Sequence, residues 1–394
     1  MNLSHDPPGQ FRHASDQVHE IVADEVGSDD FGTPDYLAGL KVLLQSMDYD
    51  PHFSEAGRRI AWGRVIETLR GRAHAVKAMK DNPGFDAHAV VAPVVIVGVP
   101  RTGTTALHRL MAVDRRFQGL QTWLLDSPMP RPPIERWGEY PEFRKSVELL
   151  DAHYAASPDA RAAHHRAAQD VHECCFLLAQ SFRCNILSCS QSAATYDAWW
   201  QSQSEWPGYQ YYKKCVQLIG SNEPQTRWLL KNPGHIENLD LLFAVFPDAK
   251  VIQTHRDPAR AVPSLVALLM QMHMIVEEGR IEQRGQNMLA REVAKWSNAV
   301  HKCDKVRKSH PGQVLDVVHG DFHRDPMGTL ETIYRFIGME LTDDVRPLLQ
   351  ERIDGKPELQ HGVHRYTIAD YGMTEEEARE PFGDYIQRFD LVQT

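Results

Sequence analysis

The sequence predicts an α/β fold: a P-loop-like, doubly wound parallel sheet flanked by helices, with further helical segments at the N-terminus and in an insertion. Short β-branched apolar runs alternate with segments of helical periodicity, which is typical of a parallel sheet. A glycine-rich turn, GVPRTGTT at residues 98–105, joins the first such run to a helix. We therefore expect a single domain over residues 1–394, with ligands at the carboxyl ends of its strands.

Residues 1–88 form the predicted N-terminal helical segment. YLAGLKVLLQSM and RRIAWGRVIETLRGRAHAVKAM place apolar residues three and four positions apart, as amphipathic helices require. DNPGFDAH ends this pattern with turn-forming residues. The apolar run VVAPVVIVGV then predicts a strand buried on both faces, and ALHRLMAVD after the turn predicts a helix.

The predicted α/β core covers residues 89–340 and contains a helical insertion at about residues 131–223. No low-complexity linker separates the insertion from its neighbours, so we do not expect it to be an independent domain. Three later runs predict further strands, each followed by a helix: RWLLK, AKVIQTH and VLDVVHGDF. Residues 341–394 make up a C-terminal, lid-like segment.

Charge and composition exclude several classes of protein. A formal net charge of -10 argues against a general nucleic-acid binder, which needs clustered Lys and Arg. The N-terminus lacks the pattern of a secretory signal, and the longest apolar run, residues 263–276, is too short to span a bilayer. We interpret that run as a buried or interface helix that leaves room for a homodimer; a membrane-contacting face is the alternative. The six cysteines show no zinc-site spacing, so we expect no metal and reduced thiols in the cytoplasm.

The glycine-rich turn differs from a Walker A loop at its most important position. Gly98 and Gly103 keep the four-residue gap of that motif, but Thr104 stands where the lysine belongs. The cation lies earlier, at Arg101. Backbone N–H groups of residues 102–106 and the positive helix end can still hold an anion, with hydroxyl donors from Thr104 and Thr105. This pattern favours a phosphate with a neighbouring anionic group over a triphosphate held with magnesium.

A second candidate anion site lies in THRDPARAVPS. Arg256 ends a predicted strand, and Ser264 follows eight residues later, about two turns along a helix that starts near Pro258. An arginine and a hydroxyl on the same side of that helix can hold another phosphate. An ion pair between Arg256 and Asp257 with an incidental serine is the alternative.

Together, PRTGTT and HRDPARAVPS resemble the two nucleotide motifs of sulfotransferases that use 3′-phosphoadenosine 5′-phosphosulfate (PAPS). The chain is most similar to the bacterial branch, through HECCFLLAQSF, WLLKNPGHIENLDLLFAVFPDA, QTHRDP and YTIADYGMTEEEARE, and the resemblance covers roughly residues 90–385. It implies transfer of a sulfuryl group from PAPS, with 3′,5′-ADP as the product. The implied nucleotide-binding residues are Arg101, Thr102, Gly103, Thr104, Thr105, Ala106, Arg256 and Ser264.

The resemblance also implies a catalytic base. Glu173 matches the acidic residue of the related bacterial enzymes, and adjacent His172 stays open as a second candidate. If both lie on a helix, they point about 100° apart, so only one can face the donor. An ion pair with Arg183 is an alternative role for Glu173. Arg101 would stabilise the leaving nucleotide, and Lys231, which ends a predicted strand, would bind the sulfonate or the acceptor.

The acceptor implied is a hydroxyl or an amine of a small or lipid-like molecule. Six aromatic residues of the insertion are candidates for an apolar acceptor pocket: Trp199, Trp200, Trp206, Tyr209, Tyr211 and Tyr212. At least half of them should belong to the ordinary core. The late Gly-rich nucleotide segment of the cytosolic branch is missing, so RYTIADYGMTEEEAREPFGDY is the candidate lid.

Two other functions compete with this interpretation. An ATP-dependent P-loop phosphotransferase would need magnesium, which Thr104 in the lysine position disfavours. A non-catalytic sulfotransferase homologue would bind the bisphosphate nucleotide without turnover and would not depend on Glu173.

Overall fold

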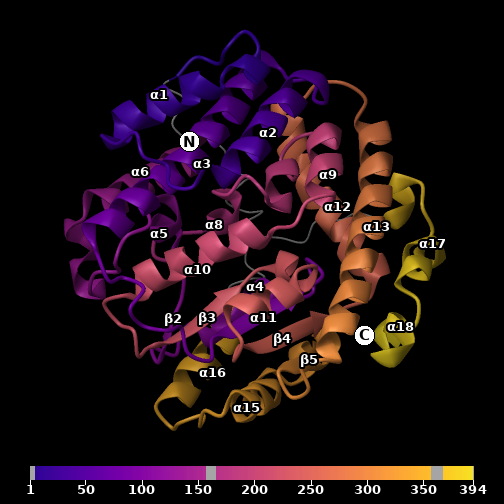
Figure 1. Cartoon of the computed structure of the whole chain (residues 1–394). Helices are drawn as coiled ribbons and strands as arrows, with labels where there is room; N and C mark the ends of the chain where they lie inside the picture. Colours follow the sequence, from indigo (N-terminus) through magenta and orange to yellow (C-terminus); the bar gives the residue numbers. More distant parts are fainter. Residues whose placement is uncertain (1–4, 157–165, 356–366, 394) are drawn as a thin grey trace. The chain divides into compact units, whose positions relative to one another are not determined.

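A computed structural model of the chain describes residues 5–156, 166–355 and 367–393 and divides it into two compact units. Unit 1 consists of Met1–Val90, Leu120–Gln225 and Gln271–Gly279; unit 2 consists of Val91–Gly119, Thr226–Met270 and Arg280–Thr394. Figure 1 shows the helices and strands of both units. A single domain over the whole chain stays a prediction.

The sheet lies in unit 2 and confirms the predicted fold class. It has five strands in the order β2-β3-β1-β4-β5, and every neighbouring pair is parallel. The strands are β1 (Val94–Gly98), β2 (Phe117–Gln118), β3 (Arg227–Lys231), β4 (Lys250–His255) and β5 (Val314–Val318). Four of them were predicted. The edge strand β2 was missed because its two residues are too few for any periodic pattern.

Helices cover both faces of the sheet, as a doubly wound fold requires. On one face, Ile96, Leu229 and Ile252 belong to a core cluster with residues of α4 and α15. On the other face, Gln253 accepts hydrogen bonds from Cys303 Sγ (3.3 Å) and Arg307 Nη1 (2.8 Å) of α13. Consecutive strand residues therefore point to opposite helical layers. The helices of this unit include α4 (Thr104–Met111), α11 (Leu239–Val245), α13 (Ile281–Arg307), α14 (His319–Arg324), α15 (Pro326–Ile337), α16 (Val345–Gly355), α17 (Glu375–Arg379) and α18 (Tyr385–Arg388).

Unit 1 is helical in the segments described. Its α-helices include α1 (Ser15–Val26), α2 (Leu37–Tyr49), α3 (Glu55–Asp81), α5 (Thr122–Asp126), α6 (Pro141–Ala156), α8 (Cys175–Ala179), α9 (Ala194–Gln201) and α10 (Trp206–Gly220). The long α3 begins where the Ser54 hydroxyl accepts from the backbone N–H of Gly57 (2.9 Å). Gly57 is required there, because a Cβ would lie 1.8 Å from the carbonyl oxygen of Val276. The predicted N-terminal and inserted helices are thus confirmed.

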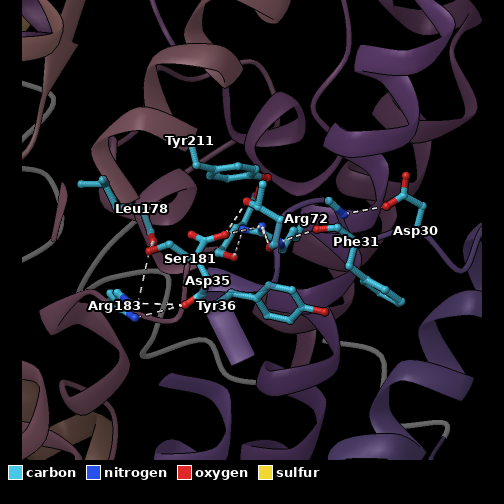
Figure 2. Close-up of polar contacts among 12 residues, drawn as sticks. Asp30, Phe31, Asp35, Tyr36, Arg72, Leu178, Ser181, Arg183 and Tyr211 are labelled. Carbon is cyan, nitrogen blue, oxygen red and sulfur yellow. Dashed lines mark hydrogen bonds and ion pairs between the residues drawn. The ribbon is translucent and has the colours of Figure 1, made fainter. Parts of the chain in front are cut away.

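A buried arginine organises the centre of unit 1. Arg72 is 1% exposed, and its guanidinium donates to the carbonyl oxygens of Phe31 (2.7 Å), Thr33 (2.8 Å) and Gln180 (3.2 Å). Figure 2 shows it between the rings of Tyr36 and Tyr211, whose centroids lie 4.3 and 4.6 Å from its Cζ. The hydrogen bonds of the Arg72 guanidinium therefore connect the loop at residues 31–35 to the end of α8.

The apolar helix α12 (Pro258–Val276) begins earlier than residue 263, where the predicted apolar run starts. At 19 residues it is long and apolar enough to cross a membrane by length and composition, so the prediction that this segment is too short to span a bilayer was wrong. However, 61% of its most apolar window is buried within the protein, as in core helices, which makes this weak evidence for a span. All six cysteines are free thiols, and all but Cys189 are buried.

Candidate functional site

The glycine-rich turn joins β1 to α4 through three residues with positive φ. Gly98 (φ 149°), Arg101 (φ 68°) and Gly103 (φ 94°) turn the chain sharply before α4 begins at Thr104. A Cβ on Gly98 would lie 2.6 Å from the carbonyl oxygen of Thr254, so only glycine fits there. Arg101 has no such freedom and occupies the left-handed region at a cost in strain. The strain lies where the anion loop was predicted.

Hydroxyl contacts brace this loop from the inside. The Thr102 side chain is 1% exposed; its hydroxyl donates to the Val99 carbonyl (2.7 Å) and lies 2.5 Å from Thr254 Oγ1 on β4. Thr104 is also buried, at 3% exposure. Thr102 therefore shapes the loop through its side chain.

The two predicted anion sites meet within unit 2. Arg101 Nε donates to the hydroxyl of Ser264 (3.1 Å) on α12, and Arg256 Nη1 donates to the carbonyl oxygen of Arg101 (3.0 Å). The Arg101 side chain is exposed, whereas Ser264 is 5% exposed. As predicted, α12 begins at Pro258, which brings Ser264 two turns along the helix to the side of the loop.

A third cation reaches the first turn of α4. Lys231 ends β3, is 2% exposed, and donates through Nζ to the Thr105 hydroxyl (3.1 Å). Lys231, Arg101 and Arg256 thus lie at or just beyond the carboxyl ends of three adjacent strands, β3, β1 and β4. Parallel strands bring their carboxyl ends to one edge of the sheet, so the three positive charges gather there. This edge attracts anions although the chain as a whole is acidic.

Two histidines near this edge, His235 and His255, are buried. His235 is fully buried, and burial lowers its pKa to about 3, so it is neutral at pH 7. His255 is also fully buried; its Nδ1 lies 3.1 Å from the Tyr385 hydroxyl and its Nε2 lies 2.8 Å from Asp316 Oδ1. His255 therefore has a packing and hydrogen-bonding role.

Sequence reasoning missed a histidine pair at the same edge. His319 directly follows β5, and its Nε2 lies 3.0 Å from Nε2 of His323. Its ring lies beside the loop, since a Cβ on Gly103 would be 3.3 Å from its Cδ2. Burial and the positive charge of Arg256 lower the pKa of His319 to about 3. The rule that found Lys231 and Arg256, polar residues at strand ends, also applies to His319.

Unit 1 holds the two candidates for the base, and there the helical prediction was wrong. His172 and Glu173 precede α8, which starts at Cys175, so the argument from helical spacing does not apply. Instead, Nδ1 of His172 accepts from the backbone N–H of Glu173 (2.7 Å), and the His172 ring packs edge-on against Phe176 (4.7 Å). Glu173 is half-buried.

The contacts of Glu173 do not decide its role. Its carboxylate accepts a weak hydrogen bond from Cys175 Sγ (3.7 Å). Arg183, the proposed ion-pair partner, donates to the carbonyl oxygen of Asp35 (3.3 and 3.4 Å), as Figure 2 shows. Glu173 as the base, with His172 as the second candidate, stays a prediction.

The aromatic residues of the insertion belong mostly to the core of unit 1. Trp200, Tyr209, Tyr211 and Tyr212 are at most 8% exposed, while Trp206 is 37% exposed. The Tyr211 hydroxyl donates to Gln180 (2.6 Å) and that of Tyr212 to Cys174 Sγ (3.2 Å). The prediction that at least half are core is confirmed. Among the described residues, no group of three His, Cys, Asp or Glu could hold a metal ion.

Comparisons with known proteins agree with this geometry. Residues 93–344 match the model of the Sulfotransferase family. The omega-hydroxy-beta-dihydromenaquinone-9 sulfotransferase Stf3 of Mycobacterium tuberculosis is 24% identical over 311 residues, which cover 77% of this chain and 76% of Stf3.

Two crystal structures extend the likeness over nearly the whole chain. Sulfotransferase STF1 from Mycobacterium tuberculosis H37Rv is 33% identical with a TM-score of 0.85, covering 95% of this chain and 99% of STF1. Sulfotransferase STF9 from Mycobacterium avium shares the fold, with 23% identity and a TM-score of 0.87 over 96% of this chain and 97% of STF9.

Proposed function

Because the chain belongs to the sulfotransferase family, we propose that it transfers the sulfuryl group of PAPS to a hydroxyl of a lipid-like acceptor. The observation that carries this proposal is the contact of Arg101 with Ser264 and of Arg256 with the Arg101 backbone. It unites a loop suited to a 5′-phosphosulfate with an arginine suited to a 3′-phosphate. PAPS is a substrate that carries both groups.

The loop would bind the 5′ end of the donor. Backbone N–H groups of residues 102–106 and the N-terminus of α4 supply donors for the phosphate, and Arg101 supplies a charge from the side. Because Thr104 replaces the Walker lysine, the cations are Arg101 within the loop and Lys231 beneath Thr105. These positions suit a group that carries less charge than a triphosphate and needs no metal.

The transfer itself is an in-line displacement. A bond forms between the acceptor oxygen and sulfur while the bond from sulfur to the bridging phosphate oxygen breaks; the electron pair stays on the leaving 3′,5′-ADP. Arg101 and Lys231 would stabilise that developing charge, and Glu173 would take the acceptor proton. Loop amides and cations align the donor in advance, which is the main work the protein has to do.

A lipid-like alcohol is the acceptor class we propose. The relative Stf3 is named for a hydroxylated menaquinone derivative, which is such an alcohol. An amine acceptor, a cytoplasmic location and a homodimer stay predictions.

A transfer assay tests this function. The protein is incubated with PAPS labelled in its sulfuryl group and with a bacterial lipid fraction. The products are then separated, and their masses are measured by mass spectrometry. We expect a lipid that gains one labelled sulfonate, with release of 3′,5′-ADP. Binding of 3′,5′-ADP with no labelled product from any fraction would favour the non-catalytic homologue instead.

A further inference from the structure

Within the C-terminal part of the chain, residues 367–393 contact the turn between β4 and α12. These residues are called the C-terminal segment below. Arg379 donates to both carboxylate oxygens of Asp257, from Nε (3.0 Å) and from Nη2 (2.5 Å). Asp257 is 4% exposed and also accepts from the backbone N–H of Ala259 (3.0 Å), so it caps α12 as well. A two-point arginine–carboxylate pair fixes orientation as well as distance.

The same segment holds the other side of this turn. Nδ1 of His255 lies within hydrogen-bond distance of the Tyr385 hydroxyl (3.1 Å). The His255 ring stacks on the ring of Phe389, with centroids 3.9 Å apart. Its Nε2 is held by Asp316 (2.8 Å), which in turn pairs with Arg307 (2.6 Å). His255 therefore has almost no freedom to rotate.

Arg256 lies between these two fixed residues. Its neighbours on either side, His255 and Asp257, are both held by the C-terminal segment, while Arg256 itself reaches the carbonyl oxygen of Arg101 (3.0 Å). The backbone of the turn sets the direction in which the Arg256 side chain leaves the chain, and its hydrogen bond to the Arg101 carbonyl sets where the guanidinium ends. A partner that fixes both flanking residues therefore fixes the point from which Arg256 reaches the loop.

We propose that Arg379 and Tyr385 are positioning residues, which hold the β4–α12 turn so that Arg256 faces the 3′-phosphate of the nucleotide. This inference rests on the proposed function, which assigns that phosphate to Arg256. It gives the C-terminal segment the role of a support behind the nucleotide site.

The test compares two nucleotides that differ only in the 3′-phosphate. Binding of 3′,5′-ADP and of 5′-AMP is measured by titration calorimetry for the full chain and for Arg379→Gln. We expect Arg379→Gln to weaken 3′,5′-ADP binding by about tenfold and to leave 5′-AMP binding within about twofold, because only the 3′ contact is disturbed. Equal weakening of both nucleotides, or no change, would overturn the inference.

Control variants separate positioning from general damage. Arg346→Gln removes another arginine–carboxylate pair of unit 2, with Glu331 (2.7 Å), and should change neither affinity. Adding Arg379→Gln to Arg256→Ala should cost little further 3′,5′-ADP affinity, since the residue it positions is gone. Fully additive losses would contradict a role through Arg256.

A milder variant covers the case in which Arg379→Gln does not fold. Tyr385→Phe keeps the ring and removes only the hydroxyl that contacts His255. It should weaken 3′,5′-ADP selectively, by about threefold, and an unchanged ratio of the two affinities would overturn the inference.

The failure of the proposed function has its own signature. If Arg256→Ala leaves the preference for 3′,5′-ADP over 5′-AMP intact, the assignment of the 3′-phosphate fails and the inference fails with it. If Arg256→Ala removes the preference and Arg379→Gln keeps it, the inference alone fails.

Discussion

Arg72 in unit 1 and Arg101 in unit 2 show two uses of the same side chain. Arg72 is 1% exposed, and carbonyl oxygens and two tyrosine rings surround its guanidinium. Arg101 is exposed, sits on a backbone with φ 68°, and has Ser264 as a hydrogen-bond partner. A cation whose donors the protein satisfies is structural, whereas a strained, exposed cation at a strand end is suited to a ligand. Unit 1 should therefore respond to mutation in stability or turnover, and the loop of unit 2 in nucleotide binding.

The largest expected effect concerns turnover. Glu173→Gln removes the proposed base but keeps the size of the side chain, so turnover of PAPS should fall by about 100-fold or more. Binding of 3′,5′-ADP should stay unchanged, because the residues proposed to bind the nucleotide lie in unit 2. Steady-state kinetics and calorimetry on the same preparation check both statements. Near-normal turnover would remove Glu173 as the base and leave His172 to be tested by His172→Asn.

The next effect concerns the stability of unit 1. Arg72→Met leaves the buried carbonyls of Phe31, Thr33 and Gln180 without this donor, which should lower the free energy of unfolding by about 3 kcal/mol. Urea denaturation measures the loss. Arg59→Met is the matched control, since its side chain is 49% exposed, and it should change stability by less than about 0.5 kcal/mol. Similar losses in both variants would contradict the structural role of Arg72.

Arg101→Gly should separate binding from stability at the loop. Glycine tolerates the positive φ at this position, so the melting temperature should rise slightly, by the equivalent of about 1 kcal/mol. Loss of the guanidinium should weaken 3′,5′-ADP binding by about 30-fold, or 2 kcal/mol. Thermal melting with and without the nucleotide reports both. A variant that binds as well as the parent would show that Arg101 does not hold the phosphosulfate end.

The smallest effect is a pH dependence of unit 2. Burial lowers the pKa of His108 and of His235 to about 3, below the value of about 6.5 expected in the unfolded chain. Between these values the unfolded state binds protons that the folded state excludes. Stability is therefore present above pH 6.5 and lost as the pH falls towards 3. From pH 7 to 5.5 each histidine should cost about 1 kcal/mol.

His235→Asn tests that pH dependence. Denaturation curves at both pH values should show a smaller loss for this variant than for the parent, by about 1 kcal/mol. An unchanged loss would show that His235 is not the group responsible.

Much of unit 2 could be predicted from local sequence. β1 is a continuous apolar run buried along its whole length, and β3, β4 and β5 each contain a shorter β-branched or leucine-rich run. The glycine turn and the start of α12 near Pro258 followed from the residue types at those positions. The rule that strand ends meet at one edge placed Arg101 and Arg256 at the same edge, but the contacts of Arg101 with Ser264 and of Arg256 with Arg101 were not predicted.

Other features depend on contacts between distant residues, which periodicity does not report. The pattern HECCFLLA suggests a helix from its first residue, yet Val171 pairs with Gln121 in an isolated bridge and α8 starts only at Cys175. The ion pair of Arg379 with Asp257 joins residues far apart in the chain, so no local sequence pattern predicts it. Tyr212 is buried, but the sequence alone did not distinguish it from a residue that lines a binding pocket. Burial depends on which distant residues pack around a side chain, and periodicity does not report those contacts.

Titration of the protein with 3′,5′-ADP, and with ATP in the presence of magnesium, shows which nucleotide the loop binds. The loop with Arg101 and Arg256 should bind 3′,5′-ADP at least about tenfold more tightly than ATP, and EDTA should not change the 3′,5′-ADP affinity. Tighter binding of ATP that disappears on adding EDTA would contradict the assignment of 3′,5′-ADP to this loop. Such binding would require a metal-assisted triphosphate site, for which Thr104 replaces the expected lysine.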